Sequence, residues 1–340
     1  MSCEGPAGID GVDGVAGDPG ADGTAVCMTC HDAGTAYAAK VDQFNESAHA
    51  LGTYYSRGGE CAGCHSTEGY LARAEFTSIT EIADLGVDNQ SAISCKTCHM
   101  VHATYDATDW DLTFADQVTE TLFGSASTTD AYESISFGDY GDGNMCLQCH
   151  QARDRGNTPA ADATADVTTG STHWGPHYGV QGNVLLASGG VNVAGDLSYP
   201  SATAGHASLD AACISCHMVD GNHTLAVGYS ACDACHTDAE DMVDVLYDEI
   251  DALKFALGKE LAAQGVASVD TETSVEWDED LGVHVETIDT VGFGPKNMTM
   301  TASQAKALYN YMVVYSDHSY GVHNPSYVRA LLNNSIDLVT

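Results

Sequence analysis

The sequence predicts a fold made mostly of loops and short α-helices, followed by a small helical C-terminal region that contains a β-hairpin. One short cysteine motif occurs six times between residues 25 and 238, and the sequence between its copies is rich in Gly, Ser, Thr and Asp. In the last hundred residues, apolar positions recur first at helical and then at strand spacing. These observations divide the chain into an arm (1–24), a motif-bearing region (25–238) and a C-terminal scaffold (239–340).

Composition and charge narrow the class of protein. The 340 residues include 11 Lys and Arg against 48 Asp and Glu, which gives a formal net charge of −37 at pH 7. So negative a chain is not expected to bind nucleic acid or an anionic membrane surface. No stretch of ~20 apolar residues predicts a membrane span. The acidity suits cationic partners, dissolved metal ions or a salty habitat equally well.

The repeated motif is Cys-x-x-Cys-His, and it uses twelve of the thirteen cysteines. Random placement of the cysteines and histidines would give about 0.02 copies. Disulfides or zinc sites also consume cysteines, but zinc uses such pairs two at a time and needs no histidine after each. The six copies are Cys27-Cys30-His31, Cys61-Cys64-His65, Cys95-Cys98-His99, Cys146-Cys149-His150, Cys213-Cys216-His217 and Cys232-Cys235-His236.

The spacing within the motif has a mechanical reason. Two thiols separated by two residues can each form a thioether with one edge of the same porphyrin, and the following histidine is then held where it can bind the iron. The sequence therefore predicts six covalently attached c-type haems. Because residues 25–238 have few apolar runs, these haems should form most of that region's core, and the apoprotein should fold poorly.

Nine further histidines are available for the opposite faces of the irons. Six irons with histidine on both faces need six more ligands. His102 lies too near His99 to bind the same iron easily, so we expect it to reach a neighbouring haem. One of His173 and His177 is expected to be a ligand, and His284 is expected to be structural. The candidates from sequence context are His49, His102, His173, His177, His206 and His223.

Two stretches of the chain resemble a known family. The run from Cys146 to His236 and the ending Asp317-His318-Ser319-Tyr320-Gly321-Val322-His323-Asn324-Pro325-Ser326-Tyr327 are similar to multihaem cytochromes of anaerobic respiratory and metal-reducing microbes. The resemblance covers about residues 25–335 and implies a haem-cored electron-transfer protein. It also implies that His323, in Gly-Val-His-Asn-Pro, is a distal haem ligand and that His318 is not.

Residues 5–23 form a separate element in which Gly recurs every third residue, as in collagen. Seven triplets with only two prolines favour an extended arm over a stable triple helix, and an arm lying along a neighbouring subunit is the alternative. No signal peptide is visible. Because c-type haem is attached outside the cytoplasm, we expect an exported protein, extracellular or at the cell surface, with the periplasm as the alternative. The odd cysteine, Cys3, could be a lipid-anchor site, an intermolecular disulfide or a spare thiol.

The C-terminal region contains clear periodic patterns. Apolar residues from Met242 to Leu261 predict an amphipathic helix over 239–264, and the alternation in 267–293 predicts a hairpin. A second helix fits 302–316, and a third is expected to start after Asn324-Pro325, since proline is favoured near helix N-termini. We expect this region to be a packing scaffold that also delivers His323 to a haem.

The function predicted from these features is electron transfer through closely spaced bis-histidine haems, without catalytic residues. Redox proteins or extracellular acceptors would be the partners. Head-to-tail polymerisation into a conductive filament is one form of this hypothesis, because a subunit could donate a histidine to the next. The alternatives are a monomeric periplasmic shuttle, a reductase of nitrite, hydroxylamine or a sulfur oxyanion with one open haem, and an adhesive surface protein.

Overall fold

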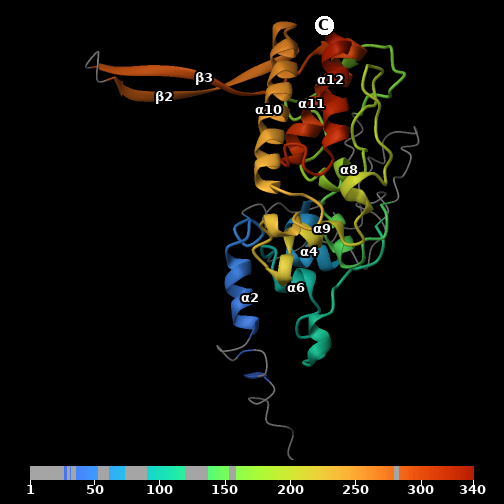
Figure 1. Ribbon diagram of the computed structural model, residues 1–340, viewed down its shortest axis with the longest axis vertical. Helices are drawn as coiled ribbons and strands as arrows, with labels where there is room; N and C mark the ends of the chain where they lie inside the picture. Colours follow the sequence, from blue (N-terminus) through green and yellow to red (C-terminus); the bar gives the residue numbers. More distant parts are fainter. Residues whose placement is uncertain are drawn as a thin grey trace, which may run out of the picture.

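A computed structural model describes residues 27–28, 31, 36–52, 61–72, 90–118, 137–152, 158–278 and 283–340. The predicted arm at 1–24, together with Cys3 and Cys30, lies outside the described residues. The chain places its C-terminal helices at one end of the molecule and the short helices of the motif-bearing region at the other (Figure 1). A long hairpin projects sideways from the helical end (Figure 1).

The motif-bearing region consists of loops and short helices, as the sequence predicts. Helix α2, at its edge, spans Ala36–Asn45 and is the longest of them. The shortness follows from the sequence, since Gly, Ser, Thr and Asp interrupt every apolar run. The other α-helices are α3 (Ala62–His65), α4 (Thr67–Ala72), α6 (Cys95–Cys98), α7 (Asn144–Leu147), α8 (Gln181–Leu185) and α9 (Ala212–His217).

Several single turns and one small sheet complete this region. The two-stranded sheet joins β1 (Val167–Thr168) to β4 (Thr299–Met300), which belongs to the C-terminal region. The 3-10 turns are η4 (Ala107–Trp110), η6 (Gly141–Gly143), η7 (Gly205–Ser208), η8 (Val219–Gly221) and η9 (Tyr229–Ala231).

Three long helices form the scaffold that the apolar periodicity predicts. They are α10 (Ala239–Ala263), α11 (Ala302–Asp317) and α12 (Pro325–Val339), and they pack side by side (Figure 1). Thr301 and Gln304 form a capping box at the start of α11, and the Asn324 side chain accepts a hydrogen bond from the Tyr327 N–H at the start of α12. The apolar sides of these helices meet in one core that includes Ile250, Leu257, Leu261, Leu308, Val313 and Leu331.

The hairpin consists of β2 (Ala267–Asp278) and β3 (Val283–Pro295), paired antiparallel from Ala267↔Pro295 to Asp278↔Val283. A bulge interrupts the register at Asp270/Thr271. The base of the hairpin is fixed to α10, because Phe293 packs against the backbone of Gly258. A Cβ at Gly258 would lie 2.1 Å from the Phe293 ring, so the close approach requires glycine.

The main core also takes in a segment from the motif-bearing region. Trp174, Val180, Val184, Val191 and Val193 pack into the same core as α10, α11 and α12. Buried polar side chains of the helices hold this segment by its backbone. Asn310 Oδ1 accepts from the Val191 N–H at 2.7 Å, its Nδ2 donates to Val191 O at 2.8 Å, and the Tyr327 hydroxyl accepts from the Gly190 N–H. The packing scaffold therefore begins well before residue 239.

A second, smaller core lies among the motifs themselves. It consists of Val118, Phe137, Tyr140, Leu147, Leu185, Leu186, Ala207 and Ala212. The Tyr140 hydroxyl donates to Ala207 O at 3.2 Å, and this bond ties two ends of the cluster together. Among the helices of the described ranges, none is both long and apolar enough to cross a bilayer.

Candidate haem-binding sites

The motif residues lie on single helical turns. The N–H of the motif histidine donates to the C=O of the first motif cysteine at His99 (2.8 Å), His150 (3.0 Å) and His236 (2.8 Å). Residues i, i+3 and i+4 of such a turn share one face. The two thiols and the imidazole of a motif are therefore presented together, as attachment to one porphyrin requires.

The structure brings each of the six motif histidines opposite a second histidine. The ring centroids of every pair are between 6.0 and 6.4 Å apart. Five of the six second histidines were candidates from sequence context, and the sixth, His323, came from the family resemblance. The pairs are His31–His102, His65–His177, His99–His223, His150–His49, His217–His323 and His236–His206.

This separation is the one that a single metal ion between two imidazoles demands. A metal–nitrogen bond of about 2 Å on each side, plus about 1.1 Å from each ring centre to its nitrogen, separates the centroids by about 6 Å. Two rings in van der Waals contact would stack more closely. Each pair supplies two ligands, and a porphyrin supplies the other four of a six-coordinate iron. The pairs therefore fit haem, whereas zinc would need two more protein ligands at each site.

Hydrogen bonds at Nδ1 orient many of these rings. Each of seven paired histidines has an oxygen acceptor at Nδ1, which leaves Nε2 as the metal-binding nitrogen. The rings are thus fixed in position and in tautomer by their surroundings. The acceptors are Trp110 O for His99 (2.7 Å), Gln181 Oε1 for His150 (3.0 Å), Tyr178 O for His177 (2.6 Å), Val322 O for His206 (2.8 Å), Leu225 O for His217 (3.0 Å), Gly221 O for His223 (2.8 Å) and Asp317 Oδ1 for His323 (2.7 Å).

Burial keeps several of these imidazoles neutral. Burial first, and the nearby His150 second, lower the pKa of His49 to about 4. Burial also lowers the pKa of His150 and of His223. At neutral pH the three rings therefore carry a free nitrogen lone pair, which is the form that binds a metal.

The structure holds His223 through a distant helix and His102 through nearby residues. Helix α2 supports His223, whose N–H donates to Gln43 Oε1 at 3.0 Å, while Lys40 Nζ donates to Gly221 O. His102 adopts a left-handed conformation with φ 65°, and its N–H donates to Asp109 Oδ2 at 2.9 Å. Its ring stacks on Tyr105 at 5.5 Å. These contacts place His223 opposite His99 and His102 opposite His31, both of which are distant in sequence.

A continuous cavity of about 2930 Å³ runs between the histidines of five of the six pairs. Pockets for one small molecule have volumes of roughly 300–1,000 Å³, so this space is large enough for several large flat ligands. Its walls combine motif cysteines with apolar side chains such as Tyr70, Leu147, Leu185 and Leu246. The motif and distal histidines that line it are His49, His65, His99, His150, His177, His206, His217, His223, His236 and His323.

Successive motifs lie near one another. The Cys146 and Cys213 side chains are hydrogen-bonded, and Cys98 is close enough to Cys146, and Cys216 to Cys232, for the charge of one thiolate to raise the pKa of the other. This proximity places the third, fourth, fifth and sixth motifs in sequence order. The second motif lies beside the third, because Thr67 Oγ1 on α4 is 2.8 Å from Thr97 Oγ1 on α6.

The first motif connects to the third through two aromatic side chains. The His31 ring lies 5.8 Å from Tyr37, Tyr37 lies 5.2 Å from Trp110, and Trp110 lies 6.1 Å from His99. Both members of the first pair, His31 and His102, are exposed. This site is therefore the one nearest to solvent on the α2 side of the molecule.

Comparisons with known proteins agree with the motifs. The chain is 23% identical over 334 residues to the C-type polyheme cytochrome OmcB from two strains of Geobacter sulfurreducens. The match covers 83% of this chain and 44% of OmcB, so the chain spans less than half the length of that relative. The relative is a polyheme cytochrome, and this chain itself repeats the haem-attachment motif six times. The chain is a multihaem c-type cytochrome.

A solved structure is also similar to this cytochrome. Outer cell wall cytochrome OcwA matches with a TM-score of 0.49 and 16% identity, over 88% of this chain and 50% of the OcwA chain. No protein-family model matches the chain.

Three histidines of the cytochrome lie outside the six pairs. His173 is exposed, and its N–H donates to Ser171 Oγ, so of the predicted alternatives it is His177 that faces a motif histidine. His284 lies on β3 opposite Trp277. His318 ends α11 with φ 55° and stacks on Tyr178 at 6.2 Å.

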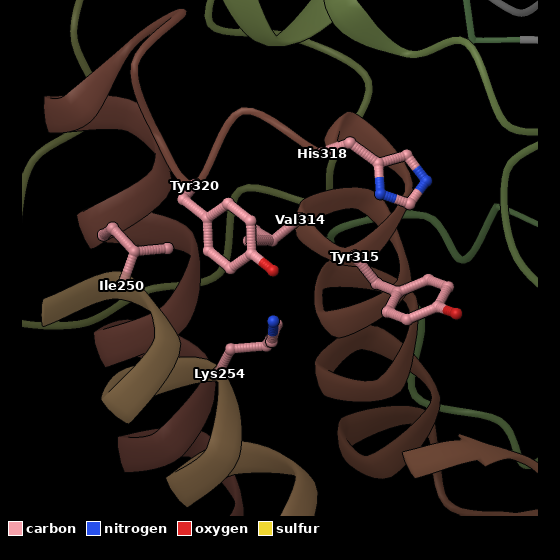
Figure 2. Close-up of a pocket in the computed structure, with 6 residues that line it drawn as sticks. All are labelled: Ile250, Lys254, Val314, Tyr315, His318 and Tyr320. Carbon is pink, nitrogen blue, oxygen red and sulfur yellow. The ribbon is translucent and has the colours of Figure 1, made fainter. Parts of the chain in front are cut away.

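The surroundings of His318 differ from those of the paired histidines. Figure 2 shows it at the rim of a small pocket of about 50 Å³ between α10 and α11, beside Tyr315 and Tyr320. Lys254 Nζ lies 4.7 Å from the centre of the Tyr320 ring. His318 is therefore part of an aromatic cluster at the edge of the large cavity, which it also lines, whereas Asp317 and His323 belong to a candidate haem site.

No pattern in the sequence points to the residues that orient the paired histidines. Gln181, Asp317 and the carbonyl of Trp110 bond to histidines between 6 and 31 residues away. Only Asp317 had a usable signal, because it lies six residues before His323, at the end of α11.

Proposed function

We propose that this cytochrome carries six c-type haems and moves electrons from one haem to the next. Each haem would be attached through the two cysteines of one motif and bound axially by the motif histidine and its opposite partner. The observation that supports this most strongly is the set of six histidine pairs with centroid separations of 6.0–6.4 Å.

The chain's own residues supply attachment, orientation and insulation. Haem, when bound, supplies the one-electron couple of its iron. The Nδ1 hydrogen bonds hold the imidazoles in place, so little rearrangement is needed when an electron arrives or leaves. The apolar cavity wall excludes water from the path. The contacts between motifs support a route from the first motif through the third, fourth and fifth to the sixth, with the second beside the third.

The test is a count of haems by coordination state. Haem is quantified per chain, and the oxidised protein is examined by low-temperature electron paramagnetic resonance and near-infrared magnetic circular dichroism. Six low-spin haems with bis-histidine signatures are expected. A stoichiometric high-spin signal, or fewer than six haems per chain, would overturn the proposal.

The rival function is a reductase that keeps one haem with an open axial position. The six intrachain pairs argue against it, because each motif histidine already faces a second imidazole. Carbon monoxide provides the test. The reduced cytochrome is expected to show no large Soret shift on exposure to it, and stoichiometric binding to one haem would favour the reductase.

We propose that the cytochrome works outside the cytoplasm, extracellularly or at the cell surface, with redox proteins or extracellular acceptors as partners. A filament of stacked copies is a second candidate form. It is favoured by the projecting β2–β3 hairpin, since an isolated two-stranded hairpin is marginally stable and gains most from a neighbour (Figure 1). The intrachain pairs make a histidine donated by a neighbour unnecessary. Negative-stain images and size-exclusion chromatography that show only monomers would exclude the filament.

A further inference from the structure

Among the seven Nδ1 hydrogen bonds that the described residues show, one differs in the chemistry of its acceptor. Five of the seven Nδ1 acceptors are main-chain carbonyls, and His150 has the neutral side-chain amide of Gln181. His323, by contrast, has the carboxylate of Asp317 at 2.7 Å. A charged acceptor forms a stronger bond than a neutral one. The pair His217–His323 is therefore distinguished by a full negative charge beside one ligand.

The Asp317 carboxylate is buried and held in position. Its side chain is 0% exposed, and the Ser319 hydroxyl donates to Oδ2 while Oδ1 faces the His323 ring. The backbone N–H of His323 donates to Ser319 Oγ, which closes the loop around the carboxylate. Burying a charge is costly unless it is paired and hydrogen-bonded. An arrangement this complete indicates that the charge has a role at the site.

The charge acts on the ligand and on the iron in the same direction. A carboxylate that accepts the Nδ1–H makes Nε2 a stronger electron donor to the metal. Oxidised iron carries one more positive charge than reduced iron, so both the stronger donor and the nearby negative charge stabilise the oxidised form. Low local polarity enlarges the electrostatic part of this effect, because the site is buried.

We propose that Asp317 lowers the reduction potential of the haem that His217 and His323 would hold. This inference rests on the proposed haem ligation. Gln181 lies between the two sites, since its Oε1 accepts from His150 and its Nε2 donates to Asp317 O at 3.2 Å. The Asp317 charge therefore makes an electron less stable on the His217 haem than it would be without that charge. Asp317 is a positioning and tuning residue, and it does not touch the iron.

The test compares Asp317→Asn with a matched loss of charge at the same haem. Asp142→Asn is the control, because Asp142 is exposed, lines the cavity and precedes Gly143, where a Cβ would lie 3.8 Å from the Cys213 Cβ of the same motif. Redox titration followed by electron paramagnetic resonance reports each low-spin haem separately. The His217 haem is identified as the signal that changes in His323→Met.

Asp317→Asn is expected to change the reduction equilibrium of that haem at least tenfold in favour of the reduced form. This change raises the reduction potential by at least 59 mV for one electron. Asp142→Asn is expected to change the equilibrium less than twofold, because an exposed carboxylate is screened by water. Equal shifts in the two variants, or no shift in Asp317→Asn, would overturn the inference.

A second variant predicts the opposite sign. Ser319→Ala keeps the carboxylate but removes the hydroxyl that donates to Oδ2. The charge on Asp317 is then less dispersed, so the potential of the same haem should fall. A rise in Ser319→Ala as large as that in Asp317→Asn would mean that disturbed packing, and not charge, sets the potential. If the unmodified protein lacked six low-spin haems, the ligation itself would fail, which is a different result from an unmoved potential.

Discussion

At the scale of single residues, each motif histidine faces a partner from a distant part of the chain. His150 faces His49, and His217 faces His323, although about a hundred residues separate the members of each pair. At each site the cysteines and the motif histidine are thus close together in sequence, whereas the second histidine comes from another part of the chain. The six motifs and the supply of second ligands could be predicted from the sequence. The pairing could not, because spacing along the chain carries no information on which loop lies above which ring.

His173 and His177 are close in sequence, but the local structure brings only one of them opposite a motif histidine. They are four positions apart in the sequence, but the His177 ring lies 6.1 Å from His65, whereas His173 is exposed on the surface. His177→Ala is expected to leave one haem without its second protein ligand, and so to convert one of six haems from low spin to high spin and allow it to bind carbon monoxide. Electron paramagnetic resonance and carbon monoxide titration measure this change.

His173→Ala is the matched control, with the same loss of an imidazole from the same loop. It should retain every low-spin signal. A high-spin haem in His173→Ala, or unchanged coordination in His177→Ala, would show that the pair assigned here is wrong.

At the scale of elements, helices were predictable where apolar residues recur at regular spacing. The expected helices at 239–264, 302–316 and after Pro325 correspond to α10, α11 and α12. Periodicity did not reveal that residues 174–193 pack against them, because this segment joins the core through irregular loops held by side-chain hydrogen bonds. Such bonds depend on three-dimensional proximity, and single buried polar residues in a helix give no sign of their partners.

Asn310 is the main link between α11 and this segment. Its amide makes both hydrogen bonds to Val191 and a third to Ser335 Oγ, all of them buried. Asn310→Leu keeps the size but leaves the Val191 N–H and C=O without partners, which should lower the free energy of unfolding by about 2–4 kcal/mol. Chemical denaturation of the haem-loaded protein measures this loss. Asp337→Asn, at an exposed position of α12, should change stability by less than about 0.5 kcal/mol.

An ion pair joins α10 to α12 and makes a pH-dependent contribution to the free energy of unfolding. Arg329 Nε and Nη2 each donate to one oxygen of Glu249 at 2.6 Å. The hydrogen bond from Arg329 lowers the pKa of Glu249 below its usual 4.5. A lowered pKa means that the pair stabilises the fold above the unfolded-state pKa and that this stability disappears as the pH falls through the folded-state value.

Glu249→Gln should therefore lower the free energy of unfolding by about 0.5 kcal/mol at pH 7, since water screens this half-exposed pair. The difference between the two proteins should stay constant above the unfolded-state pKa of Glu249 and vanish as the pH falls through its lowered folded-state pKa. Thermal unfolding across this range measures it. A difference that grew on acidification would contradict the assigned direction of the pKa shift.

At the scale of the whole molecule, the described residues form two cores of different kinds. The large core around α10, α11 and α12 is built from protein side chains alone. Around the motifs there is a small apolar cluster and a cavity of about 2930 Å³ lined by cysteine, histidine and apolar residues. A folded protein interior is close-packed, so a space of this size must be filled by ligand if the surrounding loops are to keep their positions.

Removal of haem should therefore unfold one part of the molecule and spare the other. In a variant with all twelve motif cysteines replaced by serine, haem cannot be attached. Amide hydrogen exchange should then show protection lost over residues 36–52, 90–118 and 205–236, where the cavity wall has little packing of its own. Protection should persist over α10, α11 and α12, because their core contains no motif residue. Equal loss of protection throughout would mean that the helical scaffold also depends on haem, and full protection of the loops would mean that the small cluster around Phe137 and Leu147 is sufficient to hold the cavity open.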